Sequence, residues 1–232
     1  MHWVSSISQR TKGYRHSYAL NTLRLRKKVV LYMHPLDDLS DELIRELKSA
    51  GWISGRPRRD KEGFFVRTEK NVAITDDSWK EFVETFNPGV EPLSADILSR
   101  LAPARLILAE LWKIAIPRFE TYLVHFDPID GISDADTIRL LSTHVSDVLI
   151  PIGEIRSEAI LLFGASGRYF AMGYVGAGVY FFGESFAVAI DQIMRRKFLW
   201  PVYFEPEVSW HLRLEGLQRD DPGVYIPPHA DQ

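Results

Sequence analysis

Two apolar segments joined by a short turn constrain the fold of this chain more than any other feature. EAILLF (158–163) and RYFAM (168–172) are rich in strand-forming residues, and GASG (164–167) lies between them. A turn this short pairs its two strands antiparallel, because a parallel pair needs a crossover connection of about a dozen residues. The pattern predicts a β-hairpin and argues against a purely parallel sheet.

Helical periodicity dominates the first half of the chain. Apolar residues recur at helical spacing in 39–47 and in 79–86, where Asn87-Pro88 follows. A helix is also predicted over 94–115, broken at Pro103, with RLILAELWKIAI (105–116) apolar nearly all round as in a buried helix. Further strands are predicted at 119–126, 148–154 and 179–183, and further helices at 135–146 and 184–196. Helices that precede antiparallel strands predict the α+β class, as one domain with a mainly antiparallel central sheet and flanking helices.

The segment AGWISGRPRRD (50–60) places a tryptophan beside a cluster of arginines. Ser40 is a suitable N-cap for the preceding helix, and Gly51 suits the left-handed position just past its end. In such a helix stop, Trp52 would pack back on Leu47, so the Gly-Trp pair is interpreted as structural rather than as an exposed binding tryptophan. For Arg56, Arg58 and Arg59 two interpretations remain open. They form either a solvated loop or part of a partner-binding surface.

The charge of the chain is unevenly distributed. Residues 1–36 hold seven cations and no acid, so the 28 Lys+Arg and 31 Asp+Glu leave about −10 on residues 37–232. The predicted division is a basic N-terminal extension (1–36), the main domain (37–200) and a polar, partly loose C-terminal extension (201–232). The basic N-terminal extension, called the basic arm below, resembles an organellar transit peptide or a nucleic-acid-binding arm. Alternatively, Met33 is the natural initiator, or residues 1–32 are a dispensable extension.

The residues do not form a recognisable catalytic or cofactor-binding pattern. The chain has no cysteine, which excludes disulfides and thiolate metal sites. GASG lacks the Gly-x-Ser-x-Gly spacing of a nucleophile elbow, and the glycines after residue 172 do not form Gly-x-Gly-x-x-Gly. The loop FDPIDGISDAD (126–136) lacks the alternating acids of a calcium loop. Glu154 and Glu184 are interpreted as a turn acid and a helix-start acid. The sequence therefore predicts no catalytic residues, no cofactor and no metal, and no apolar run approaches the ~20 residues of a membrane span.

An ordered set of short motifs runs through most of the chain. It comprises LIRELKSAGWISGR (43–56), LILAELWKIAI (106–116), HFDP (125–128), LIPIGE (149–154), GRYF (167–170) and GESFAVAIDQIM (183–194). In order and spacing they resemble the SUKH superfamily, and specifically its third subgroup of immunity proteins, over roughly residues 38–197. The chain departs from that family at 110–113, where Glu-Leu-Trp-Lys replaces a Phe-Gly-Gly-like step and predicts a continued helix.

The resemblance implies an α+β binding protein and not an enzyme. Members of this superfamily act as cytoplasmic immunity proteins of bacterial polymorphic toxin systems, which bind and block a cognate toxin domain that is often a nuclease. The expected partner is thus a toxin domain of basic character, with no membrane and no nucleic acid involved. The alternative is a regulatory protein–protein interaction module of the same fold. Only the basic arm favours a third possibility, nucleic-acid binding.

An acidic surface would suit a basic partner, because opposite charge accelerates and orients association. The densest acidic stretch nominates Asp127, Asp130, Asp134 and Asp136 as candidate partner-binding residues, with a plain solvated loop as the alternative. Trp79 and Tyr174 are aromatic candidates for the same role if they are exposed.

Overall fold

The computed structural model describes most of the chain after the basic arm. The chain divides into two units, Met1–Tyr32 and Met33–Gln232, and the second contains every described residue. Residues 1–33 of the predicted basic extension (1–36) and the arginine cluster at 56–59 lie outside the described residues, whereas Leu36 is buried in the domain. The described ranges are 34–53, 65–67, 72–74, 76–87, 93–118, 121–128, 134–174, 178–195 and 200–228.

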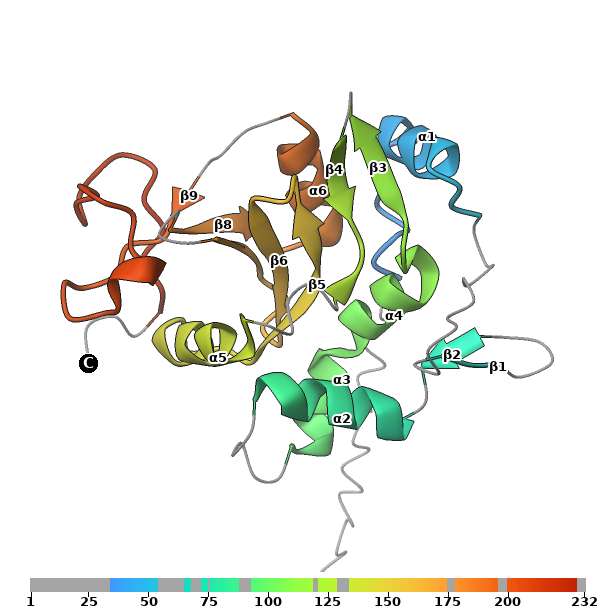
Figure 1. The fold of residues 1–232 in the computed structure, drawn as a ribbon, viewed down its shortest axis with the longest axis horizontal. Coiled ribbons are helices and arrows are strands. Elements are labelled where there is room, and N and C mark those ends of the chain that lie inside the picture. The colour runs from blue at the N-terminus through green and yellow to red at the C-terminus, as the bar shows by residue number, and fades with distance from the viewer. Residues whose placement is uncertain are drawn as a thin grey trace, which may run out of the picture. The chain divides into compact units, whose positions relative to one another are not determined.

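Helices and strands give the predicted α+β class, although Phe65–Arg67, Val72–Ile74 and Ala115–Arg118 are strands that the sequence did not predict (Figure 1). The helices are α1 (Asp41–Ser49), α2 (Asp76–Phe86), α3 (Ala95–Arg100), α4 (Ala102–Leu111), α5 (Ala135–His144) and α6 (Phe186–Met194), with a 3-10 helix at Trp210–Leu212. The strands are β1 (Phe65–Arg67), β2 (Val72–Ile74), β3 (Ala115–Arg118), β4 (Thr121–His125), β5 (Leu149–Ile155), β6 (Ala159–Gly164), β7 (Tyr169–Gly173), β8 (Val179–Gly183) and β9 (Trp200–Pro201).

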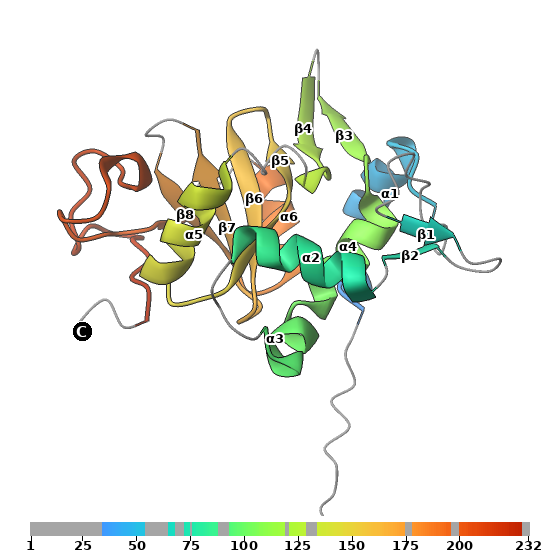
Figure 2. The ribbon, with the colours of Figure 1, turned by 60° about the horizontal axis from the view of Figure 1, so that its bottom comes forward.

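A seven-stranded antiparallel sheet forms the centre of the domain. Its strand order, β3-β4-β5-β6-β7-β8-β9, follows the sequence order, and every neighbouring pair is antiparallel. Helix α6 packs against β8 and β4, whereas α2, α4 and α5 pack against β5 (Figure 2). Strands β1 and β2 pair separately as a two-stranded sheet. This arrangement confirms the predicted α+β class with a mainly antiparallel central sheet.

Helix α1 ends in the predicted hydrophobic clasp. The Ser40 hydroxyl accepts from the N–H of Leu43 at 3.3 Å, and Gly51 adopts a left-handed φ of 91°. The N–H of Trp52 donates to the Leu47 carbonyl at 2.8 Å, which is the six-to-one bond of a Schellman motif. Trp52 is buried and its Nε1 donates to Glu110 Oε2 at 3.3 Å, so this tryptophan fixes α1 against α4.

The predicted helix over 94–115 is shorter and is broken elsewhere. The break falls at Leu101, because Pro103 is tolerated in the first turn of α4. The prediction that the helix continues through 110–113 is wrong. Helix α4 ends at Leu111, Lys113 takes a left-handed φ of 57°, and its N–H donates to the Phe126 carbonyl at 2.9 Å. Pairing with the segment after β4 therefore overrides the apolar helical pattern.

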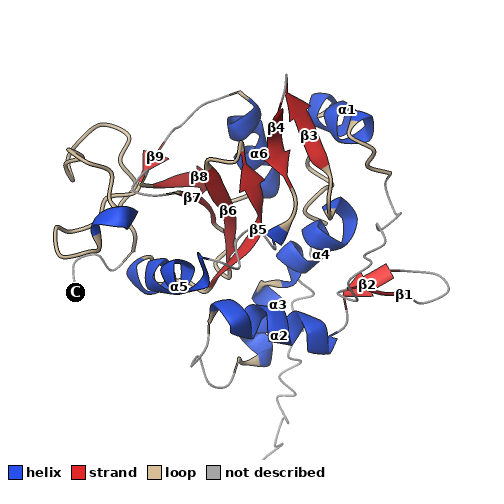
Figure 3. Cartoon of the chain, viewed as in Figure 1, coloured by secondary structure: helices blue, strands red, loops and turns tan. Residues whose placement is uncertain are grey.

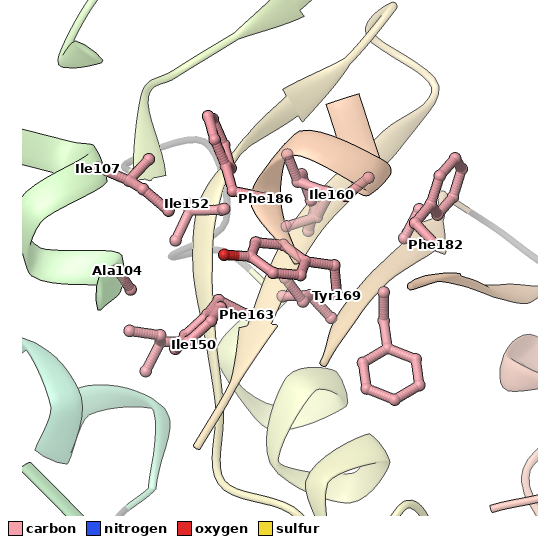
Figure 4. Close-up of a cluster of buried hydrophobic side chains, with 14 of the residues drawn as sticks. Ala104, Ile107, Ile150, Ile152, Ile160, Phe163, Tyr169, Phe182 and Phe186 are labelled. Atoms are coloured by element: carbon pink, nitrogen blue, oxygen red, sulfur yellow. The ribbon is translucent and has the colours of Figure 1, made fainter. Parts of the chain in front are cut away.

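Aromatic side chains from the sheet and α6 form the centre of the core (Figure 4). The rings of Phe163 and Tyr169, on the two strands of the predicted hairpin, lie 5.0 Å apart. Phe186 of α6 lies 6.1 Å from Tyr169 and 5.9 Å from Phe126. All four are at most 2% exposed, and burying such a side chain stabilises the fold by about 1.5–3 kcal/mol. Burial also raises the pKa of Tyr169.

The C-terminal segment is tied to the edge of the sheet beside β9. Val202 forms a parallel bridge with Tyr225, and backbone bonds join Tyr203 N to Tyr225 O at 3.0 Å and Tyr225 N to Pro201 O at 2.9 Å. The Tyr225 ring stacks on Phe181 with 4.1 Å between centroids. Within the predicted, partly loose C-terminal extension (201–232), Tyr225 is therefore held in place by edge pairing and aromatic contact.

Candidate functional site

The four nominated acids do not form one exposed surface in the described structure. Asp127 is only 8% exposed, and its N–H donates to the His125 carbonyl at 3.0 Å. Asp134 is half-buried at the N-cap of α5, and Asp136 is exposed and paired with Arg139. Asp130 lies outside the described residues. The structure thus places one of the four, Asp136, on the exposed surface.

Three of the four aromatic and carboxylate candidates are buried or half-buried in the domain. Trp79 is 2% exposed, where it stacks on Phe82 at 5.7 Å. The Tyr174 hydroxyl donates to Glu154 Oε1 at 2.7 Å. Glu154 is 8% exposed and lies within β5, so its interpretation as a turn acid is wrong, whereas Glu184 is exposed. Trp79, Tyr174 and Glu154 stabilise the domain and are poor candidates for contacting a partner.

The GASG turn is held by hydrogen bonds to the carboxylate of Asp147. The carboxylate of Asp147, which lies between α5 and β5, accepts from the Ser166 N–H at 3.0 Å and from Arg168 Nη2 at 3.3 Å. A Cβ at Gly164 would lie 2.2 Å from Asp147 Oδ2, so only glycine lets the carboxylate approach. Gly167 adopts a φ of 88°, as the turn requires. The turn thus connects the two strands and binds Asp147, in agreement with its interpretation as a hairpin connection.

Within the described ranges, no group of three or more His, Cys, Asp or Glu side chains is placed to hold a metal ion. A polar cavity of about 370 Å³ lies between α3 and α5, where Arg100 and Arg139 contribute to its lining. Each of these arginines forms an ion pair with an acid on its own helix, Asp96 and Asp136 respectively. The opposite charges therefore largely cancel at this cavity.

A second cavity, of about 590 Å³, lies in the C-terminal segment between Val202 and Gln218. Trp210 lines it and is 64% exposed, the most exposed of the large hydrophobic side chains that the structure describes. Sequence reasoning missed this site because it treated residues 201–232 as a partly loose extension. The signal in the sequence was a run of aromatic and acidic residues, VYFEPEVSW (202–210).

Comparison of the chain with family models, with curated proteins and with solved structures finds no match in any of the three. The fold, the charge of residues 37–232 and the geometry of the C-terminal cavity are therefore the observations from which a function can be argued. Among the described helices, none has the length and apolar character required to cross a bilayer.

Proposed function

We propose that this chain is an immunity protein that binds a toxin domain of basic character and neutralises it by occlusion. The observation that carries the proposal is the acidic excess of residues 37–232, about −10, on an α+β domain with a central antiparallel sheet. A nuclease toxin holds a polyanion, so its active cleft is typically basic, and an acidic inhibitor is steered to it. The ordered motifs that resemble the third SUKH subgroup support the same function.

The proposal assigns no catalytic role to any residue and needs no cofactor. Its place of action is the cytoplasm, where a nuclease toxin would meet its substrate. The alternative is a regulatory interaction module of the same fold whose partner is not a toxin. A regulatory module would have the same acidic residues 37–232 and the same kind of binding surface as an immunity protein. Only the identity of the partner therefore distinguishes the two functions.

Affinity capture of the tagged full chain from its native host tests the proposal, with bound proteins identified by mass spectrometry. We expect a stoichiometric partner that carries a basic C-terminal toxin domain. That domain should arrest growth when expressed alone and should be harmless when co-expressed with this chain. A stoichiometric partner without toxicity would favour the regulatory module, and the absence of any stoichiometric partner would contradict both.

A further inference from the structure

Residues 202–225 form a long loop whose two ends are joined at the edge of the sheet (Figure 3). Between those ends the loop contains one 3-10 helix, Trp210–Leu212, and no other helix or strand. Loops of this length without regular structure are uncommon in compact domains, and the ordered ones are usually functional. The loop is therefore a stronger candidate for binding than the helices and strands that form the core.

Contacts along the loop fix it to the domain. The ring of Phe204 lies 6.0 Å from that of His144 on α5, and Leu212 is fully buried. A Cβ at Gly178 would lie 3.1 Å from the Leu214 Cβ, so Leu214 packs closely on the backbone that leads into β8. A surface held in place in this way loses little conformational entropy when a partner binds.

The loop encloses the 590 Å³ cavity described above, within the roughly 300–1,000 Å³ of typical ligand pockets. Arg213 and Glu215 contribute one charge of each sign to its lining. The apolar part of the lining consists of Val202, Phe204, Pro206, Trp210, Leu214 and Leu217. The cavity thus combines apolar and polar lining residues beside an exposed tryptophan, and tryptophan is among the residues that contribute most to binding in protein interfaces.

The loop is negatively charged. It holds two arginines, Arg213 and Arg219, against five acids: Glu205, Glu207, Glu215, Asp220 and Asp221. Arg219 lies 3.6 Å from Glu205, so the remaining acids give the loop its net sign. Partial burial, the hydrogen bond to Glu205 and the charge of Glu207 raise the pKa of Tyr203, which lines the cavity, and Arg219 opposes them. The loop as a whole carries a net charge of −3.

We propose that this loop is the partner-docking surface, and that it binds a basic protein segment whose central apolar side chain enters the cavity beside Trp210. The proposal rests on the proposed function in that it assigns the surface through which a basic partner is held. The apolar part of the cavity lining holds the anchoring side chain, and the acids of the loop select a partner whose flanking residues are Lys or Arg.

The charge of the loop decides between this occupant and two others. A nucleic acid would bring further negative charge to a surface that already carries −3. A second copy of the chain would place two such loops against each other, and like charges in an interface oppose association. A basic peptide segment is the occupant that matches both the cavity and its acidic surroundings.

A peptide titration of the full chain tests this surface directly, with a synthetic peptide in place of the natural partner. The chain has six tryptophans, so the indole N–H signal that disappears in Trp210→Phe identifies Trp210 in a proton–nitrogen correlation spectrum. The probe is a nonapeptide with a central Phe flanked by Lys and Arg. One control peptide replaces the Lys and Arg by Glu, and a second replaces the central Phe by Ser.

We expect the basic Phe peptide to shift the Trp210 indole signal and the backbone signals of 203–218 saturably, and less so at high salt. The acidic peptide should shift neither, and the Ser peptide should bind at least tenfold more weakly. Trp210→Gln should abolish the saturable shift of the loop backbone, whereas Leu106→Gln, at an exposed apolar residue of α4, should preserve it. Glu207→Lys with Glu215→Lys should weaken binding more than Asp38→Lys with Glu81→Lys, which changes the net charge equally.

Three results would overturn the proposal. They are the absence of a shift at Trp210, an equal shift with the acidic peptide, and shifts that map to another face of the domain. The same variants separate this inference from the proposed function. If a toxin partner is captured and its affinity is unchanged by Trp210→Gln and by the Glu207/Glu215 reversal, the docking surface is wrong while the immunity function stands. If the peptide binds as expected and the captured partner is no toxin, the function is wrong while the surface stands.

Discussion

At the scale of single residues, a buried ion pair holds together three segments that are distant in sequence. Arg168 Nη2 lies 3.3 Å from Asp147 Oδ2, and the two side chains are 11% and 4% exposed. Arg168 Nη1 also donates to the Tyr225 hydroxyl at 2.7 Å, and the Ser166 N–H donates to the same Asp147 carboxylate. The pair therefore joins the turn before β5, the GASG hairpin and the C-terminal tail.

Removing one partner of this pair should be strongly destabilising, since it leaves the other charge buried without compensation. We expect Asp147→Ala to lower the free energy of unfolding by about 3–5 kcal/mol. The matched control is Asp136→Ala, which breaks the exposed pair with Arg139 and should cost about 0.5 kcal/mol or less. Urea denaturation of the three proteins measures both effects, and equal costs would show that the Asp147 pair adds nothing beyond a surface contact.

His144 should make the stability of the domain depend on pH. Burial lowers its pKa from the ordinary value of 6.5, so the unfolded chain takes up the proton at a higher pH than the folded chain. The stability that this histidine contributes is complete above the unfolded value and is lost as the pH falls below it. Between about pH 8 and about pH 5.5, wild type should lose more free energy of unfolding than His144→Gln. Equal losses in parallel urea titrations would contradict this.

At the scale of elements, the end of α1 illustrates how a local motif sets a tertiary contact. The left-handed Gly51 turns the chain so that Trp52 packs back on the helix and reaches Glu110 on α4. His34 Nε2 lies 3.3 Å from the other oxygen of the same carboxylate. Glu110 thus joins the segments before and after α1, and the position of α1 depends on the geometry at Gly51.

Gly51→Ala should destabilise the domain because an alanine Cβ is strained at a φ of 91°. We expect a loss of about 1–2 kcal/mol in the free energy of unfolding. Gly51→Asn should lose less, since asparagine tolerates the left-handed region better than alanine. Thermal and urea denaturation check the order glycine, asparagine, alanine. An alanine variant as stable as wild type would mean that the helix end does not depend on this conformation.

At the scale of the whole molecule, the C-terminal segment around Tyr225 pairs with the edge of the central sheet. Strand β9 is short, and the parallel bridge between Val202 and Tyr225 covers the edge beyond it. Covering an edge in this way limits pairing with other chains. Tyr225 therefore covers the edge of the sheet. Its bridge to Val202 also joins the two ends of the loop that carries the proposed docking surface.

Tyr225→Ala should destabilise the whole domain because it removes the stack on Phe181 and the hydroxyl bound by Arg168. We expect a loss of about 2 kcal/mol, and a smaller loss for Tyr225→Phe, which keeps the ring. Trp210→Gln in the same loop should change stability by about 0.5 kcal/mol or less, since its side chain is largely exposed. Unfolding followed by circular dichroism compares the three variants. If Tyr225→Ala has the same free energy of unfolding as wild type, the C-terminal segment contributes no stability.

The sequence predicted correctly those features that depend on neighbouring residues. The cap and stop of α1, the buried face of α2 and the GASG hairpin all follow from side chains within a few positions of one another. For α2, the predicted Asn87-Pro88 stop agrees with a helix that ends at Phe86, where Asn87 Nδ2 donates to the Leu149 carbonyl at 3.1 Å. Local sequence does not show which acids are exposed, and Asp127, one of the four nominated acids, is buried.

By itself the sequence determined the α+β class, the acidic character of residues 37–232 and the ends of α1, α2 and the GASG hairpin, because periodicity, turn chemistry and charge are local or additive. Only the tertiary structure decided where α4 ends, since Lys113 is held by the distant Phe126. It likewise decided that Tyr225 returns to the sheet edge and that Trp210 stands exposed beside a cavity. These outcomes depend on contacts between residues far apart in the chain, which form only once the sheet exists to supply the partners.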